Sequence, residues 1–253
     1  AGVIVLGPRI GKYAKDGKPR AIPGHSIPLA IFGVLVLFFG WFGFNGGSTL
    51  AAVGADLAIG TVLLNTTIAG SAGALVAAIV NTLTSGKPDP AMIGNGALAG
   101  LVGITAGPDL ATNWWAFIVG AVCGAVVVLA VSFFDRVRVD DPVGATSVHL
   151  VCGAVGTLFV GVYAAGEATG ASNGATISLL TQLIGVASVF GFVFVVSFTL
   201  FKLLDVLMGL RVSEQEELDG LDLHEHGVAG YPDLVLGASS SPGFGGATAV
   251  RTE

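Results

Sequence analysis

The sequence predicts an all-α membrane protein, a polytopic helical bundle of about six spans that follow a short helical stub. Its 253 residues are 53% hydrophobic and only 11% charged, whereas an ordinary soluble domain carries about twice that charged fraction. Several runs are apolar over the roughly 20 residues that a helix needs to cross a bilayer. Glycine is abundant, with 39 residues, and small residues let membrane helices pack closely. This composition favours one bundle over separate anchors.

The stub and the spans occupy residues 1–210. Residues 1–6 are apolar but too few to cross a membrane, and we expect the chain to start inside a helix, as a fragment or one half of a longer protein. The predicted spans are 27–50, 55–84, 91–107, 112–134, 144–166 and 177–209. The third is short and follows a loop that ends in Pro88 and Pro90, which suit the start of a helix. Residues 211–253 then form a tail.

The positions of the basic residues orient the bundle, because Lys and Arg concentrate in short cytoplasmic loops. If the loop at 9–26 is cytoplasmic, every basic residue falls on the inner side or at the inner end of the last span. These residues are Arg9, Lys12, Lys15, Lys18, Arg20, Lys87, Arg136, Arg138, Lys202, Arg211 and Arg251. We therefore expect a multi-pass protein of the cell membrane, in contact with the lipid bilayer and with a cytoplasmic tail.

The net charge of −6 comes from the tail. Residues 1–210 hold nine basic and nine acidic residues, whereas residues 211–253 hold two basic and eight acidic residues. No basic surface suited to nucleic acid follows from this distribution.

His149 lies in a segment that is otherwise apolar. An ionisable residue at membrane depth is costly and usually faces the bundle interior or a cavity. On a regular helix, Ala145, Gly153 and Gly156 share its face and leave room beside the ring. A neutral imidazole donates one hydrogen bond and accepts another, which suits a pore for a small polar solute. The alternative is a core histidine satisfied by a backbone carbonyl or a hydroxyl group.

A second candidate site lies near the outer end of the first span. Trp41, Phe44 and Ser48 are spaced i, i+3 and i+7 and share a helix face, while Gly43 and Gly47 could pack against a neighbouring helix. An aromatic ring beside a hydroxyl group can hold a small cation. The alternative is an interfacial aromatic cluster with a glycine packing seam.

The acidic residues near the span ends are expected to be structural. Asp56 could cap the second span. Asp140 and Asp141 precede a helix and follow basic residues, so we expect an ion-paired inner loop. Lys202 and Asp205 are three positions apart and could pair.

The remaining histidines and cysteines predict no cofactor or metal. His25 lies in an inner loop, where it could be solvated or cap a helix. His224 and His226 are two positions apart in the tail, without the further ligands that a metal site needs. Cys123 and Cys152 lie in apolar segments and are expected to pack as small hydrophobic residues. No nucleophilic triad or phosphate-binding loop is present, so the chain is not expected to be an enzyme.

Four motifs in order resemble successive helices of the ammonium transporter (Amt/Mep/Rh) family. They are "GWFGFNGGS" at 40–48, "GNGALAGLVGITAG" at 94–107, "RVDDPVGATSVHLVCGAVGTL" at 138–158 and "GLRVSEQEELDGLDLHEHG" at 209–227. The resemblance covers nearly the whole chain except about the last 20 residues. It implies an eleven-helix fold with inverted repeats, of which this chain would hold the end of helix five, helices six to eleven and the cytoplasmic tail.

The resemblance also implies roles for particular residues. Phe44 matches the pore-gating phenylalanine, and Ser48 matches the serine of the outer ammonium-recruitment site. His149 matches the second histidine of the pore pair, and Thr105 falls in the matching eighth-helix motif. The first pore histidine would lie within about ten residues upstream of Ala1.

The function implied is transport of ammonium or ammonia, and of methylammonium, through a hydrophobic pore. The cation would be recruited at the outer site and deprotonated, and ammonia would pass the pore histidines. The resemblance further implies a homotrimer and a PII-type regulatory protein at the cytoplasmic tail. Two alternatives stay open: an ammonium-sensing receptor of the same fold, and a channel for another small neutral solute.

Overall fold

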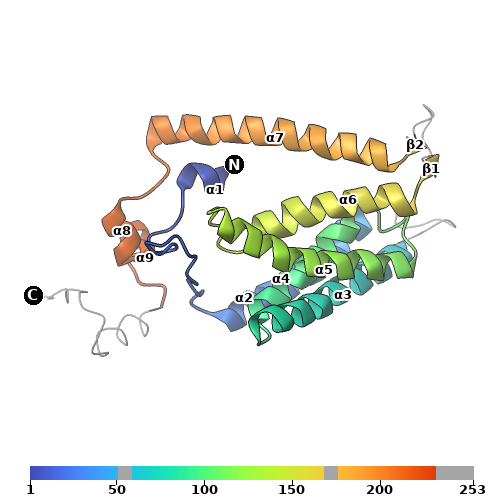
Figure 1. Cartoon of the computed structure of the whole chain (residues 1–253), viewed down its shortest axis with the longest axis horizontal. Coiled ribbons are helices and arrows are strands. Elements are labelled where there is room, and N and C mark those ends of the chain that lie inside the picture. Colours follow the sequence, from blue (N-terminus) through green and yellow to red (C-terminus); the bar gives the residue numbers. More distant parts are fainter. Residues whose placement is uncertain (51–58, 168–175, 232–253) are drawn as a thin grey trace, which may run out of the picture.

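The computed structural model describes residues 1–50, 59–167 and 176–231, and nearly all of its regular structure is helical (Figure 1). The exception among these residues is a pair of short antiparallel strands, β1 (Gly166–Glu167) and β2 (Thr176–Ile177). The helices in chain order are α1 (Gly2–Leu6), α2 (Ile27–Gly47), α3 (Ile59–Ser85), α4 (Pro90–Thr105), α5 (Asn113–Arg136), η1 (Thr146–Val151), α6 (Cys152–Tyr163), α7 (Leu179–Met208), α8 (Glu214–Asp219) and α9 (Leu221–His226).

The predicted spans correspond to helices of the structure. Within the described residues, five helical segments are long and apolar enough to cross a membrane: α2, α3, α5, the continuous segment of η1 and α6, and α7. The predicted third span is α4, an apolar helix of 16 residues. It begins after the cap formed by Asp89, with Pro90 as its first residue. The helical membrane fold is therefore confirmed, whereas Asp56 and residues 232–253 of the tail lie outside the described residues.

Helices α3, α4 and α5 form the most closely packed part of the bundle (Figure 1). A Cβ atom at Gly73 of α3 would overlap the carbonyl oxygen of Gly96 in α4, so only glycine permits this approach. The predicted use of small residues in packing is thus confirmed here. A Cβ atom at Gly43 or Gly47 would meet no described atom of another helix within 4 Å, so the packing expected of these two glycines stays a prediction. The neighbouring Gly46 packs against α3 instead.

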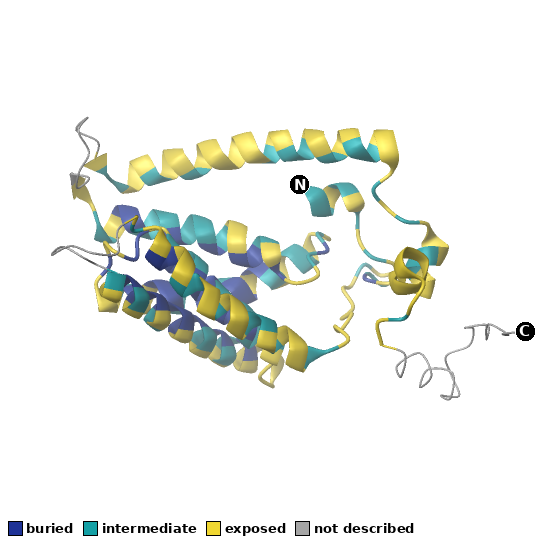
Figure 2. Cartoon of the chain, turned by 180° about the vertical axis from the view of Figure 1, so that it is seen from behind, coloured by how far each residue is buried: buried dark blue, intermediate teal, exposed yellow. Residues whose placement is uncertain are grey.

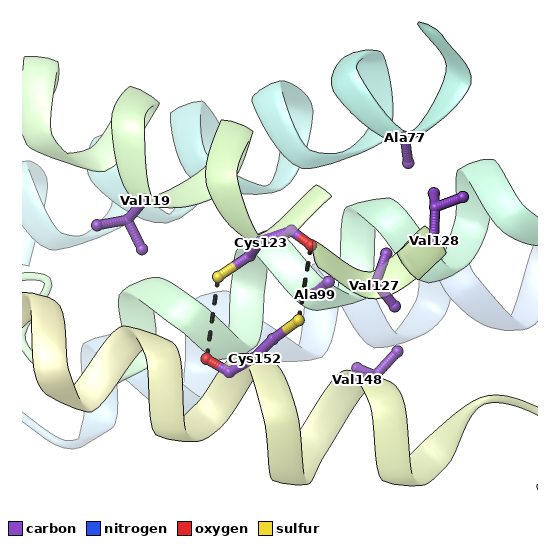
Figure 3. Close-up of a cluster of buried hydrophobic side chains, with 8 residues drawn as sticks. All are labelled: Ala77, Ala99, Val119, Cys123, Val127, Val128, Val148 and Cys152. Atoms are coloured by element: carbon purple, nitrogen blue, oxygen red, sulfur yellow. Dashed lines mark hydrogen bonds between the residues drawn. The ribbon is translucent and has the colours of Figure 1, made fainter. Parts of the chain in front are cut away.

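Two thiols link α5 to the start of α6 (Figure 3). The Sγ atom of Cys152 lies 3.5 Å from the carbonyl oxygen of Cys123, and the Sγ atom of Cys123 lies 3.9 Å from the carbonyl oxygen of Cys152. Both cysteines are free and buried, among small apolar side chains that include Val127 and Val148. They pack as predicted, and they join two helices closely.

Helix α7 stands apart from the other long helices (Figures 1 and 2). It has 30 residues, none of them buried. It contacts α6 near Gly161 at one end, and Phe201 contacts Gly2 of α1 near the other. A cavity lies between α7 and α6.

The loop at 7–26 is joined to the segment before η1 by ion pairs, as predicted for Asp140. Arg9 donates two hydrogen bonds of 2.8 Å from its guanidinium and one of 2.9 Å from its backbone to the Asp140 carboxylate. Because Arg9 hydrogen-bonds to this carboxylate, the pKa of Asp140 lies below its ordinary value. Lys12 pairs with Asp135 at 2.8 Å. These contacts attach the loop to the ends of α5 and η1.

The first part of the tail also contacts this loop. The backbone N–H of Ile10 donates to Glu217 of α8 at 2.8 Å, and Arg211 pairs with the same carboxylate. His25 is exposed, and its ring lies 4.5 Å from the ring of Tyr231. The predicted pair of Lys202 and Asp205 is present, with its charged atoms 3.4 Å apart.

Candidate functional site

His149 lies in a π-helical turn, which sequence periodicity did not predict. The backbone N–H of Cys152 reaches the carbonyl of Ser147, five residues earlier, as in a π-helix. Ser147 and Val148 are buried on one side of the turn, while His149 and Leu150 are exposed on the other. π turns are rare and occur frequently at functional sites.

The His149 side chain lines a cavity of about 1090 Å³ between α1, the segment of η1 and α6, and α7. The wall is mostly apolar and includes Phe190 and Phe194 of α7. His149 is the one histidine among the residues that line this wall. Within the described parts of the chain, no group forms a hydrogen bond with its ring. The structure therefore does not support the alternative of a satisfied core histidine.

The small residues around His149 divide between two surfaces. Ala145 and Gly153 line the cavity together with the histidine, as predicted. Gly156 does not, because it packs against the backbone of Gly103 in α4. The prediction for Gly156 was wrong because it assumed a regular α-helix, and the π turn changes which residues share a face.

The outer candidate residues converge from two helices. The indole Nε1–H of Trp41 in α2 donates to the hydroxyl oxygen of Thr105 in α4 at 2.7 Å. The Thr105 hydroxyl in turn donates to the carbonyl of Leu101 at 2.7 Å. The rings of Trp41 and Phe44 are in edge contact, with centroids 6.1 Å apart. Thr105 thus fixes the orientation of the indole, and the indole contacts the Phe44 ring.

Ser48 lies one turn beyond Phe44. Its hydroxyl donates to the Phe44 carbonyl at 2.7 Å, which leaves the lone pairs of the oxygen free to accept a hydrogen bond. Phe44 and Ser48 are both exposed. A cation with N–H groups could therefore meet a hydroxyl acceptor and aromatic faces at this end of α2.

The outer residues and His149 belong to two separate places, and α4 lies between them. None of Trp41, Phe44, Ser48 and Thr105 lines the cavity that contains His149. A side chain at Gly153, beside His149, would contact Val102 of α4, and Val102 lies one turn before Thr105. The structure therefore brings together the four predicted residues at the end of α2 and in α4. It connects His149, the fifth, to them through α4.

Buried amides and hydroxyls near the outer site were missed by the sequence reasoning. Asn45 donates to the hydroxyl of Thr66 at 2.9 Å, and both residues are buried. Asn65 donates to the carbonyls of Pro108 and Ala111 at 2.9 and 2.7 Å. Asparagine inside an apolar span was an available signal, since a buried amide needs hydrogen-bond partners. These bonds tie α2 to α3, and α3 to the loop after α4.

The tail histidines have a local contact. The Nε2 atom of His224 lies 3.4 Å from the Asp219 carboxylate. Across residues 1–50, 59–167 and 176–231, no three His, Cys, Asp or Glu side chains are placed to hold a metal ion.

The apolar helices, their glycine packing and the two polar places at α2 and η1 define a polytopic helical membrane protein. The model of the Ammonium Transporter Family matches residues 1–231. The chain belongs to this family, which is a family of transporters and not of enzymes.

Curated relatives and solved structures agree with this assignment. The chain is 39% identical to ammonium transporter Amt2 of Archaeoglobus fulgidus, covering 96% of this chain and 53% of the relative. It is 39% identical to ammonium transporter Amt1 of Haloferax mediterranei, covering 100% of this chain and 49% of the relative. The chain therefore spans about half the length of these relatives.

Two solved structures have a similar fold. A protein described as "Sensor Amt Protein" matches with a TM-score of 0.80 and 36% identity, covering 89% of this chain and 55% of that one. Mep2 of Candida albicans matches with a TM-score of 0.71 and 28% identity, covering 85% of this chain and 49% of that one.

Proposed function

We propose that the protein transports ammonium across a membrane, with methylammonium as an accepted analogue. The observation that carries the proposal is the His149 side chain, which is exposed in a mostly apolar cavity with no hydrogen-bond partner among the described residues. Its ring nitrogens are free to donate to and accept from a small solute. Membership of the family supports ammonium as that solute.

The apolar wall requires a change of charge during transport. Moving a bare ammonium ion through such a pore would cost several kcal/mol, because the ion would lose its hydration without gaining a counter-charge. Ammonia has no such charge. We therefore propose that ammonium loses a proton before it enters the apolar segment, that ammonia passes along His149, and that the imidazole offers hydrogen bonds and a route for the proton.

Recruitment of the cation belongs to the outer end of α2. The Ser48 oxygen can accept an N–H hydrogen bond, and the Trp41 ring is held in place by Thr105. The exposed Phe44 ring contacts Trp41, and Phe44 lies one turn before Ser48 in α2. We propose that Phe44 gates entry from this site.

Assembly and regulation are further parts of the proposal. The protein would work as a homotrimer in the cell membrane, with a pore in each subunit and a cytoplasmic tail. A PII-type protein would bind at the tail, where α8 lies against the inner loop through Ile10 and Glu217.

A second candidate is an ammonium sensor, favoured by the similarity to the protein described as "Sensor Amt Protein". Full-length protein in proteoliposomes separates the two functions. An inward ammonium gradient should produce a saturable signal, measured as membrane current and as a change of internal pH, and methylammonium should compete. Saturable ammonium binding without any flux would contradict transport and support the sensor.

A further inference from the structure

We propose that Asp141 is a positioning residue: its carboxylate fixes the start of the π turn and thereby directs the His149 ring into the cavity. The inference deepens the proposed function, on which it rests, because it assigns a residue that sets the orientation of the pore imidazole.

The first anchor of the turn is the Asp141 carboxylate. One oxygen accepts the backbone N–H of Ala145 at 3.0 Å, and the other accepts that of Thr146 at 2.6 Å. Such N–H groups at a helix start have no partner within the helix, and a charged acceptor binds them strongly. Gly144 has a φ of 75°, in the left-handed region that favours glycine, and this conformation turns the chain back toward Asp141.

The second anchor follows the turn. Cys152 is fully buried, and its thiol lies 3.5 Å from the Cys123 carbonyl of α5. One turn later, a Cβ atom at Gly156 would overlap the Gly103 carbonyl of α4. Helix α6 therefore can neither rotate nor slide at this point without a clash.

The turn between the anchors holds more residues than a regular helical turn. A π-helix bonds residue i to residue i+5, so one extra residue is accommodated. Ser147 is fully buried in this turn, and its hydroxyl has no hydrogen-bond partner among the described residues. Burying a hydroxyl group without a hydrogen bond costs free energy. The π turn therefore needs a contact that keeps it from converting to a regular α-helix.

Loss of the Asp141 carboxylate removes that contact. Residues 146–151 can then adopt regular α-helical hydrogen bonds that continue α6, which stays fixed. The extra residue of the π turn is accommodated in the loop before Ala145. A shift of one position on an α-helix is a rotation of about 100°. His149 would turn away from the cavity, and a neighbouring apolar side chain would take its place.

The test uses full-length protein in lipid, with ¹⁵N-labelled histidine and solid-state NMR. The His149 ring signal is identified by its absence in His149→Ala. We expect Asp141→Ala to shift this signal and to reduce ammonium flux about tenfold or more, since small misplacements of a functional group cost this much.

Asp89→Ala is the matched control, because Asp89 accepts the N–H of Ala91 at 2.9 Å and caps α4, a helix without histidine. The control should leave the His149 signal in place.

An unchanged His149 signal in Asp141→Ala, or an equal shift in Asp89→Ala, would overturn the proposal. If Asp141→Ala does not assemble, the His149 signal of Asp141→Asn tests the proposal. The amide oxygen of the introduced asparagine can keep one of the two hydrogen bonds from the backbone N–H groups of Ala145 and Thr146. A smaller shift in the same direction supports the proposal, and an unchanged signal overturns it. If His149→Ala transports ammonium at the wild-type rate, the proposed function fails, yet the ring signal still decides the role of Asp141.

Discussion

Thr105 illustrates how a single hydroxyl group can organise the outer site. It accepts the Trp41 N–H at 2.7 Å and donates to the Leu101 carbonyl at 2.7 Å, so both of its hydrogen-bonding roles are used. The indole is thereby held against Phe44. Two residues 64 positions apart in sequence form this contact, which is why the spacing along α2 predicted a shared face but not the partner in α4.

Replacing Thr105 with Val should weaken recruitment of ammonium. The substitution keeps the shape but removes the acceptor of the indole N–H, at a cost of about 1 kcal/mol. If that cost falls on binding, the ammonium concentration for half-maximal flux rises about fivefold. Thr67→Val is the control, since among the described residues the Thr67 hydroxyl bonds only to the Leu63 carbonyl of its own helix. Equal half-saturation in the wild type and Thr105→Val would show that the indole orientation does not matter.

The helices are positioned by backbone contacts that depend on glycine. In α3, a Cβ atom at Gly73 would overlap the carbonyl of Gly96, whereas one at Gly60 would meet no described atom within 4 Å. Sequence composition predicted that glycines would pack helices closely. It could not predict which glycines do so, because that depends on the neighbour that each helix face meets.

Gly73→Ala should destabilise the bundle, and Gly60→Ala should not. Inserting a methyl group into a packed interface typically costs about 1–3 kcal/mol, whereas alanine in place of an unpacked helical glycine stabilises by up to about 1 kcal/mol. The measurement is the thermal unfolding temperature of the full-length protein in detergent. Equal unfolding temperatures for the two variants would contradict the close approach of α3 and α4.

The ion pair of Arg9 and Asp140 should make the attachment of the loop at 7–26 sensitive to acid. Arg9 lowers the pKa of Asp140, so the stabilisation is present above the unfolded-state pKa and is lost as the pH falls through the lower folded-state pKa. Asp140→Asn should therefore unfold at a lower temperature than the wild type at pH 7. The difference should narrow below about pH 4. A difference that stays constant over this range would contradict the role of the carboxylate charge.

At the scale of the whole molecule, the sequence could predict only part of the structure of the described residues. Apolar runs predicted the long helices, because the length needed to cross a membrane is a property of each segment alone. The π turn at His149 was not predictable in this way, since it depends on anchors at Asp141 and Cys152 that tertiary contacts create. The cost of an ionisable residue at membrane depth made His149 a candidate site residue. Its cavity wall includes Phe190 and Phe194 of α7, which only the fold brings near.

The central proposal is that His149 contacts the transported solute, and ammonium flux in full-length His149→Ala tests it most directly. We expect flux to fall about tenfold or more, as when a proton-transferring group is removed, or selectivity over potassium to be lost. Ser197→Ala, a change in the same cavity wall, should retain both flux and selectivity. Wild-type flux together with unchanged selectivity in His149→Ala would contradict contact between His149 and the solute and would favour a channel for another neutral solute.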